Sequence, residues 1–354
     1  QLEYQECVTD SRNPWEWPGH NNWFTATATG FNGWITNFDK GTKTSVGGAT
    51  NMINAYEGVS AASDDKGNLI FFTNGRNVWD KDLNMTFSGL LEGNENGATL
   101  TRGSASQGVM TVRHPLTPKD YYVFTTDDAN GGSTLGFNYA VIDDTGNVIG
   151  GVTQLGSYRT CEGLAATFHE NGVDIWVLVQ ASTSNDFHSY LLTCDGITEH
   201  KVSPVAQLIT GSAERGGIAI SWDGKQVAAA FPSAWPNATK QVNIYDFDKK
   251  TGELSNKKDV APSNVVLSPY DMTFSKDNGS LYLTSYIGDL FSFDVSSNDK
   301  TLIAESYKKH SKPGSSHTSI EIGPDGLLYF ANNGMVNGVP DSYAPVADVQ
   351  TSLG

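Results

Sequence analysis

The chain repeats one short pattern at a nearly constant interval, and this repeat limits its fold more than any other feature. Each copy places a Ser or Gly, an acidic residue and a Gly just before a short apolar run, as in SWDGKQVAAAF (221–231) and SKDNGSLYLT (275–284). The runs begin at Asn68, Tyr121, Asp174, Gln226, Ser280 and Leu327. Successive starts lie 53, 53, 52, 54 and 47 residues apart, and a further run, NWFTATATG, begins 46 residues earlier at Asn22. A period of this length indicates an array of repeats.

Each repeat has the internal order of one antiparallel sheet. An apolar strand such as GGIAIS (216–221) precedes the turn, and Asp, Asn and Gly in the turn favour a tight hairpin. A second strand follows, then a third with alternating apolar residues, such as GDLFSFDV (288–295). A more polar fourth strand, for example KTLIAESYK (300–308), completes the unit. Four such strands in about 50 residues are typical of a β-propeller blade. The Asp and Gly of the repeat are therefore predicted to shape turns and not to catalyse a reaction.

The repeat predicts an all-β fold, a β-propeller with seven four-stranded blades. Residues 23–48 contain candidates for the second, third and fourth strands of a blade without its first strand. The segment VADVQTSLG (346–354) could supply that strand, so that strands from both termini close the ring. Six blades, with the N-terminal strands completing the last one, is the alternative. Because no linker divides the chain, we expect an N-terminal extension over 1–21 and a single propeller domain over 22–354.

Charge and composition restrict the class of partner. The net charge of −16 argues against nucleic acid and anionic membrane surfaces, because both attract Lys and Arg. No apolar run approaches the ~18–20 residues needed to cross a bilayer, so the chain is not expected to span a membrane. It has three cysteines, too few for a disulfide scaffold. A bridge between Cys161 and Cys194 is conceivable, but two buried thiols are the favoured interpretation.

The loops that enter the innermost strands of a propeller form one rim of its channel, where ligands usually bind. The position six residues before each turn falls on this rim and is mostly polar. The candidate ligand-binding residues there are Glu57, Gln107, Glu162, Arg215 and His317. Such a ring could bind a cation, a sugar or a polar peptide end. The sequence favours a simpler interpretation, in which these side chains contact only channel water and one another. Two facing carboxylates could do acid–base chemistry, but their separation does not follow from the sequence.

Aromatic and oxygen-rich segments give weaker candidates. Trp15, Trp17, Trp222 and Trp235 could stack on sugar rings, although packing is the commoner role of such residues. The segment TTDDANGGST (125–134) has oxygen ligands suited to Ca²⁺ but lacks the spacing of a calcium loop, which favours a solvated loop. We therefore predict no cofactor, and Ca²⁺ is the one metal ion whose binding the sequence leaves as an alternative.

Signatures of enzymes are mostly absent. The chain has no GxSxG elbow, HExxH pair or Walker loop. The SxDxG turns are similar to the Asp-boxes of sialidase-type propellers, but those boxes are structural turns. The chain has only six arginines, with no evident triad, which weakens the sialidase interpretation.

Several longer stretches resemble a known group of propellers. They include NNWFTATATGFNGWITNF (21–38), YEGVSAASDDKGNLIFFTNGRNVWDKD (56–82), CEGLAATFHENGVDIWVLVQ (161–180) and YDMTFSKDNGSLYLTSY (270–286). In their order along most of residues 22–332, these stretches resemble secreted, cell-surface β-propeller domains of gliding-motility and type IX secretion-associated proteins of Bacteroidota. The resemblance implies an extracellular or cell-surface location. It implies no shared catalytic residues.

Three functions from different classes fit these observations. The first is a non-enzymatic binding propeller that presents its rim loops to a glycan or protein partner, in adhesion or gliding. The second is a structural subunit of a larger surface assembly. The third is a lactonase-like or glycan-cleaving enzyme that uses a metal or paired carboxylates at the channel mouth. The acidic charge and the missing enzyme motifs favour the first function.

Overall fold

The structure is a computed structural model. It describes residues 58–88, 105–117, 119–126, 136–182, 184–208, 214–232, 241–262, 265–310, 319–323 and 328–329. It also describes the backbone of 22–26, 32–37, 42–47, 330–331 and 344–345.

The strands of these residues form antiparallel sheets, each built from strands that are consecutive in the chain. Five sheets have four strands, and the first and last sheets have three each within the described residues. The first sheet contains β1 (Asn22–Ala26), β2 (Asn32–Asn37) and β3 (Thr42–Gly47). The next two contain β4 (Ser60–Ser63), β5 (Leu69–Thr73), β6 (Asn77–Asp80) and β7 (Met85–Ser88), then β8 (Val109–Arg113), β9 (Asp120–Thr125), β10 (Phe137–Asp143) and β11 (Val148–Gly156).

The remaining sheets follow the same order. The fourth contains β12 (Thr160–Phe168), β13 (Ile175–Ala181), β14 (Phe187–Thr193) and β15 (Gly196–Ser203). The fifth contains β16 (Ile218–Ile220), β17 (Gln226–Ala230), β18 (Val242–Asp248) and β19 (Glu253–Asp259). The sixth contains β20 (Pro269–Phe274), β21 (Ser280–Ser285), β22 (Leu290–Asp294) and β23 (Lys308–Lys309), and the last contains β24 (Ser319–Ile322), β25 (Leu328–Ala331) and β26 (Ala344–Pro345).

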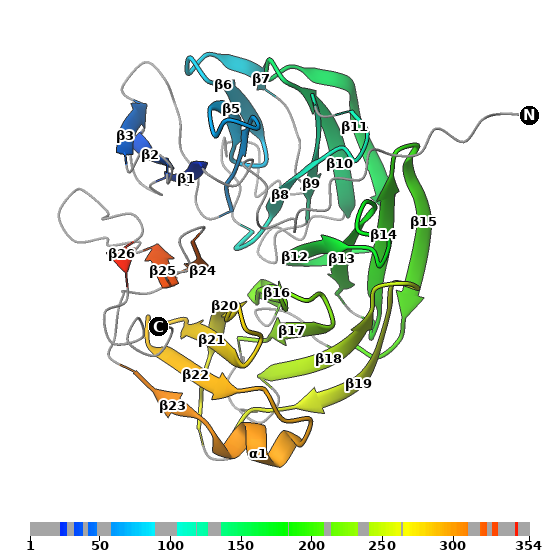
Figure 1. Ribbon diagram of the computed structural model, residues 1–354, viewed down its shortest axis with the longest axis vertical. Helices are drawn as coiled ribbons and strands as arrows, with labels where there is room; N and C mark the ends of the chain where they lie inside the picture. The colour runs from blue at the N-terminus through cyan, green and yellow to red at the C-terminus, as the bar shows by residue number, and fades with distance from the viewer. Residues whose placement is uncertain are drawn as a thin grey trace, which may run out of the picture.

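The sheets succeed one another around a common centre (Figure 1), and the first strand of each sheet from β4 onward contacts the first strand of the next. Strands β4, β8, β12, β16, β20 and β24 thus form the inner lining. This arrangement is a β-propeller, and the predicted all-β propeller fold is confirmed. The segment 346–354, expected to close the ring, lies outside the described residues.

The repeated turn has the role that the sequence predicts. After β16, the Ser221 hydroxyl donates to Asp223 Oδ1 at 2.7 Å and accepts the N–H of Gln226 at 2.9 Å. Gly224 has a φ of +72°, which is unfavourable for other residues. Asp223 and Gly224 therefore fix the hairpin that joins β16 to β17.

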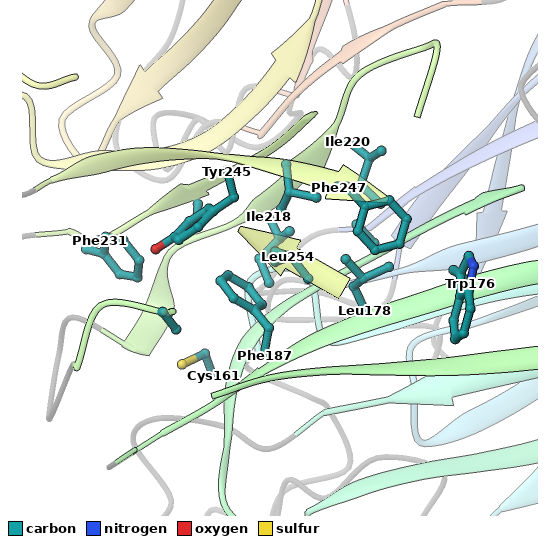
Figure 2. Packing of buried hydrophobic residues seen from close by; sticks show 14 of the residues in the cluster. Cys161, Trp176, Leu178, Phe187, Ile218, Ile220, Phe231, Tyr245, Phe247 and Leu254 are labelled. Atoms are coloured by element: carbon teal, nitrogen blue, oxygen red, sulfur yellow. The ribbon is translucent and has the colours of Figure 1, made fainter. Parts of the chain in front are cut away.

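The strand after this turn packs on both of its faces. Ala228, Ala229 and Ala230 are all buried. Ala229 belongs to the core between sheets β12–β15 and β16–β19, which Figure 2 shows, whereas Ala228 and Ala230 belong to the core on the β20–β23 side. Successive strand residues point to opposite faces, so one alanine run serves two interfaces between sheets.

Residues 300–308 depart from the prediction. We expected a fourth strand here, but the structure has the helix α1 (Lys300–Glu305) followed by the two-residue strand β23. The Asp299 carboxylate caps the helix by accepting the N–H of Thr301 at 2.8 Å, and Ile303 is buried beneath it. The cap and the good helix formers that follow it explain why the strand prediction is wrong. Among the residues that the structure describes, no helix is long and apolar enough to cross a membrane.

The cysteines also differ from expectation. Cys161 is buried and free, whereas Cys194 is disulfide-bonded. Both the Cys161–Cys194 bridge and the interpretation of Cys194 as a buried thiol are therefore wrong. Burial raises the pKa of the Cys161 thiol well above its usual value, which makes the thiol unreactive.

Candidate functional site

A cavity of about 250 Å³ lies among the innermost strands of the propeller. Its apolar lining includes Met110, Leu164, Ile218, Met272 and Ile320, which come from five successive first strands. Its polar lining residues are Ser106, Gln107, Asp271, Thr273, Ser319 and Glu321, together with Trp222 at its edge. The cavity thus combines apolar side chains with a comparable share of polar groups, which could fix the orientation of a bound group.

Gln107 and Asp271 connect the inner strands across this cavity. The Gln107 side chain donates through Nε2 to Asp271 Oδ1 at 2.7 Å and accepts the N–H of Ile218 at 2.9 Å. Asp271 Oδ2 accepts the N–H of Ile320 at 3.1 Å. Strands β16, β20 and β24 and the loop before β8 are therefore joined by one network. The predicted rim residue Gln107 is a member of it.

Glu321 is the second carboxyl group of the cavity. Its Oε1 accepts from the Thr273 hydroxyl at 3.2 Å and from the N–H of Ile322 at 3.1 Å. Burial raises the pKa of Asp271 to about 6. Burial, followed by the negative charge of Asp271, raises the pKa of Glu321 to about 7. Near neutral pH a fraction of these carboxyls is therefore protonated, so the cavity can both donate and accept hydrogen bonds.

Neither Asp271 nor Glu321 is among the site residues predicted from the sequence. The one available signal is an acidic residue inside an otherwise apolar first strand, as in YDMTFS (270–275) and SIEIG (319–323).

Two other predicted rim residues, Glu162 and Arg215, are not part of the cavity lining. Glu162 lies within β12, is fully buried, and accepts the N–H of Ser106 through Oε2 at 2.8 Å. The Ser106 hydroxyl donates to the carbonyl oxygen of Arg215 at 2.6 Å. Glu162 and the Arg215 backbone thus hold the loop that carries Gln107. Glu57 and His317 lie outside the described residues.

The structure describes only some of the tryptophan and calcium-binding candidates. Trp222 is partly buried, packs against two cores, and donates through Nε1 to the carbonyl oxygen of Phe274 at 3.0 Å. The Lys276 ammonium lies 5.2 Å above its ring, so the described contacts of Trp222 are within the protein. Trp15, Trp17, Trp235 and most of the loop 125–134 lie outside the described residues. Within the described ranges, no three His, Cys, Asp or Glu side chains are grouped to hold a metal ion.

Three large apolar side chains are exposed on the same rim as Gln107. They are Leu208, Val266 and Ile287, which are 57%, 60% and 58% exposed. Leu208 and Val266 lie on loops that enter the first strands β16 and β20, and Ile287 lies between the second and third strands β21 and β22. In an antiparallel blade these loops emerge at the same end. The N–H of Tyr286 also donates to the carbonyl oxygen of Ser268 at 2.7 Å, which joins two of the loops. We call these three residues the apolar rim.

No family model and no curated protein matches the chain. Solved structures with similarity to it include Hsv2 of Kluyveromyces lactis, at 13% identity and a TM-score of 0.48 over 90% of each chain. The β-propeller domain of Myceliophteria thermophila Cps50 (Swd1) is 11% identical, with a TM-score of 0.48 over 89% of this chain and 94% of that one. A chain of the Mitotic Checkpoint Complex is 14% identical, with a TM-score of 0.47 over 95% and 88% of the two chains. Likeness at this level carries no argument about function.

Replacing Glu321 by glutamine should flatten the dependence of stability on pH. Because the folded protein holds this proton to about pH 7 and the unfolded chain releases it near 4.5, folding is favoured at low pH and this contribution is lost as pH rises between the two values. We expect E321Q to be about 2 kcal/mol more stable than the wild type at pH 8 and equal to it at pH 4.5. Urea unfolding at both values measures this difference.

Glu253→Gln is the matched control, because Glu253 is an exposed carboxylate on β19. It should leave the pH dependence unchanged. Equal pH dependence in the wild type and E321Q would show that the Glu321 carboxyl is solvated in the folded protein.

Proposed function

We propose that this chain is a non-enzymatic binding propeller that holds a protein partner on its apolar rim. The observation that carries this proposal is the exposure of Leu208, Val266 and Ile287 on loops at one end of two neighbouring sheets. Large apolar residues gathered at one end of a soluble protein mark interaction sites. The cavity among the inner strands offers Gln107, Asp271 and Glu321 to a polar group of the same partner. Asp271 and Glu321 have no ion-pair partner among the described residues, which favours a partner with a hydrogen-bond donor or a cationic group.

We further propose that the propeller is a single domain over 22–354, closed as a ring of seven blades. The separate sheets β1–β3 and β24–β26 at the two ends of the chain support this count over six. The three-stranded sheet β1–β3 is what a blade with its fourth strand outside the described residues would leave, and its strand β1 contacts the inner strand β4 of the next sheet.

An extracellular or cell-surface location, with a role in adhesion or gliding, is part of the same proposal. The disulfide at Cys194 supports it, because disulfides persist in oxidising compartments. The resemblance to surface propellers of Bacteroidota, in which type IX secretion exports such domains, supports it as well. Membership of a larger surface assembly is compatible with the same rim.

A glycan-cleaving enzyme is the second candidate, because the carboxyls of Asp271 and Glu321 have raised pKa values in one cavity. Against it, the cavity of about 250 Å³ is smaller than the usual small-molecule pocket of about 300–1,000 Å³. Binding at the rim needs no larger space.

The proposal is tested with a triple variant of the apolar rim, Leu208→Asp, Val266→Asp and Ile287→Asp. On intact cells of the source organism, a membrane-impermeant cross-linker should join the wild-type protein to one partner. The rim variant should lose that cross-link at least about tenfold, since central apolar contacts dominate interface energies.

The matched control is Ile149→Asp, Val152→Asp and Leu302→Asp. These three residues are 48%, 40% and 55% exposed on β11 and α1, away from the rim, and the control adds the same charge. It should cross-link like the wild type. If both variants cross-link equally well, the rim is not the interface. Loss of the cross-link in E321Q with an intact rim would instead place binding in the cavity.

A further inference from the structure

The cavity among the inner strands holds two carboxyl groups without a counter-charge. Asp271 and Glu321 both belong to its lining, and none of the described residues that line it is a Lys, Arg or His. Burial, and then the negative charge of Asp271, raises the pKa of Glu321, so the two carboxyls are close enough to repel each other. Carboxylates inside a protein are usually paired with a cation. Within the described part of the chain, this pair has none.

The hydrogen-bonding capacity of Asp271 is already used. Its Oδ1 accepts from Gln107 Nε2 at 2.7 Å and from the N–H of Met272 at 2.8 Å. Its Oδ2 accepts the N–H of Ile320 at 3.1 Å, and the Ser319 hydroxyl is a fourth donor to the carboxyl. An ionised carboxylate has about four acceptor positions. Asp271 therefore contributes its charge to the cavity, whereas its lone pairs are taken.

Glu321 keeps one of its two oxygens open. Both of its hydrogen bonds within the described residues end on Oε1, which accepts from the Thr273 hydroxyl and from the N–H of Ile322. No described residue donates a hydrogen bond to Oε2. The carboxyl is enclosed by protein except toward the cavity that it lines. Because an enclosed carboxylate oxygen without a donor is costly, Oε2 indicates a donor that a ligand supplies.

The open oxygen suits a compact cation on an apolar stem. A guanidinium group pairs best with two carboxylate oxygens at once, whereas an ammonium group is a point charge that needs only one. In the same cavity, the hydroxyls of Thr273 and Ser319 donate to the carboxyls and keep lone pairs for the other N–H groups of an ammonium. Met110, Leu164 and Met272 give the cavity apolar surface that can contact the methylene groups of such a stem.

We propose that the cavity binds a primary ammonium group carried on a short apolar stem, which is the end of a lysine side chain of the partner. This inference rests on the proposed function, because the protein held on the apolar rim is the source of the lysine. Ser106 and Gln107, in the loop that enters β8, belong to the cavity lining. The cavity therefore extends to the end of the propeller that carries the apolar rim. A lysine entering from this end donates to Glu321 Oε2.

The test follows the methionines of the cavity by NMR during titration with n-butylammonium, which copies the end of a lysine side chain. The full chain is labelled with carbon-13 in its methionine methyl groups and kept at pH 8. We expect the signals of Met110 and Met272, which line the cavity, to shift with a Kd of about 1 mM. The signal of Met85, which is 48% exposed on β7, should not move. n-Butanol has a similar shape without the charge and should bind about tenfold more weakly.

Variants separate the cavity from the rim. Glu321→Gln removes the charge and keeps the shape of the side chain, so it should weaken n-butylammonium binding at least about tenfold. Glu253→Gln, on the exposed strand β19, should bind the probe like the wild type. The triple variant of the apolar rim should do so as well, because the probe needs no contact with the rim. A failure of the proposed function therefore appears in the cross-link, and a failure of this inference appears in the methionine signals.

A second probe identifies the source of the ammonium group. Nα-Acetyl-lysine N-methylamide carries the same group on a peptide backbone, so it should shift the same two signals with a similar Kd. Binding of n-butylammonium alone would mean that the cavity takes a free amine and not a side chain, which would overturn the partner lysine. Unmoved signals of Met110 and Met272, equal binding of n-butanol, or equal binding by Glu321→Gln would overturn the ammonium site itself.

Discussion

Replacing Trp176 by alanine should lower the free energy of unfolding by about 3–5 kcal/mol, because it removes the largest side chain from a core shared by two sheets and leaves a cavity. Trp176 on β13 is fully buried (Figure 2) among Leu178, Ile220 and Phe247. Its indole Nε1 donates to the carbonyl oxygen of Lys249, at the turn between β18 and β19, at 2.8 Å. One side chain thus holds the β12–β15 sheet against the β16–β19 sheet. Urea unfolding measures the loss.

Trp176→Phe separates the two contributions of this residue. It keeps most of the apolar contact and removes the hydrogen bond, so we expect a loss of about 1–2 kcal/mol. Gly252→Ala gives a second, independent check. A methyl group there would lie 2.6 Å from the Trp176 ring, so the clash should disappear when Trp176 is already alanine, leaving only the cost of the left-handed backbone at a φ of +75°. Equal costs in the two backgrounds would mean that the turn and the ring do not touch in solution.

The sequence predicts the hairpins of this fold well because their causes are local. Asp223 and Gly224 set a turn through atoms within five residues, and Ala228–Ala230 show their burial as an apolar run. The strand predicted over residues 300–308 is wrong because the residue that caps the helix, Asp299, lies just before this segment. The pattern of 300–308 alone therefore does not reveal the helix.

The site is predicted less well because its properties come from distant residues. Gln107 was found by its position before a first strand, and the structure places it on the cavity. The environment of Asp271 depends on Gln107 and on the N–H of Ile320, which lie 164 and 49 residues away in the chain. No local pattern encodes such neighbours. Glu162 has the same sequence signal as Gln107, yet its side chain faces the backbone of Ser106 instead of the cavity.

Replacing Gly216 by alanine should destabilise the protein by about 3 kcal/mol or more, because the added methyl group has no space. Its Cβ would lie 1.8 Å from the carbonyl oxygen of Ala230 and 2.5 Å from that carbonyl carbon. Both atoms are backbone at the end of β17, which is held in place because the N–H of Ala230 donates to the carbonyl oxygen of Gly217 at 2.9 Å. The clash can therefore be relieved only by moving one inner strand away from its neighbour.

That movement should also reach the rim. The carbonyl oxygen of Arg215 accepts the Ser106 hydroxyl, and Ser106 adjoins Gln107, so a shift at Gly216 displaces the network that crosses the cavity. Gly172→Ala is the matched control, because Gly172 has a φ of +73° but nothing within 4 Å of an added Cβ. It should lower the free energy of unfolding by only about 1–2 kcal/mol, because alanine is strained in a left-handed backbone conformation. If Gly216→Ala costs no more than Gly172→Ala in urea unfolding, β16 and β17 separate easily. The cavity would then be a variable space, and its polar network could not position a partner.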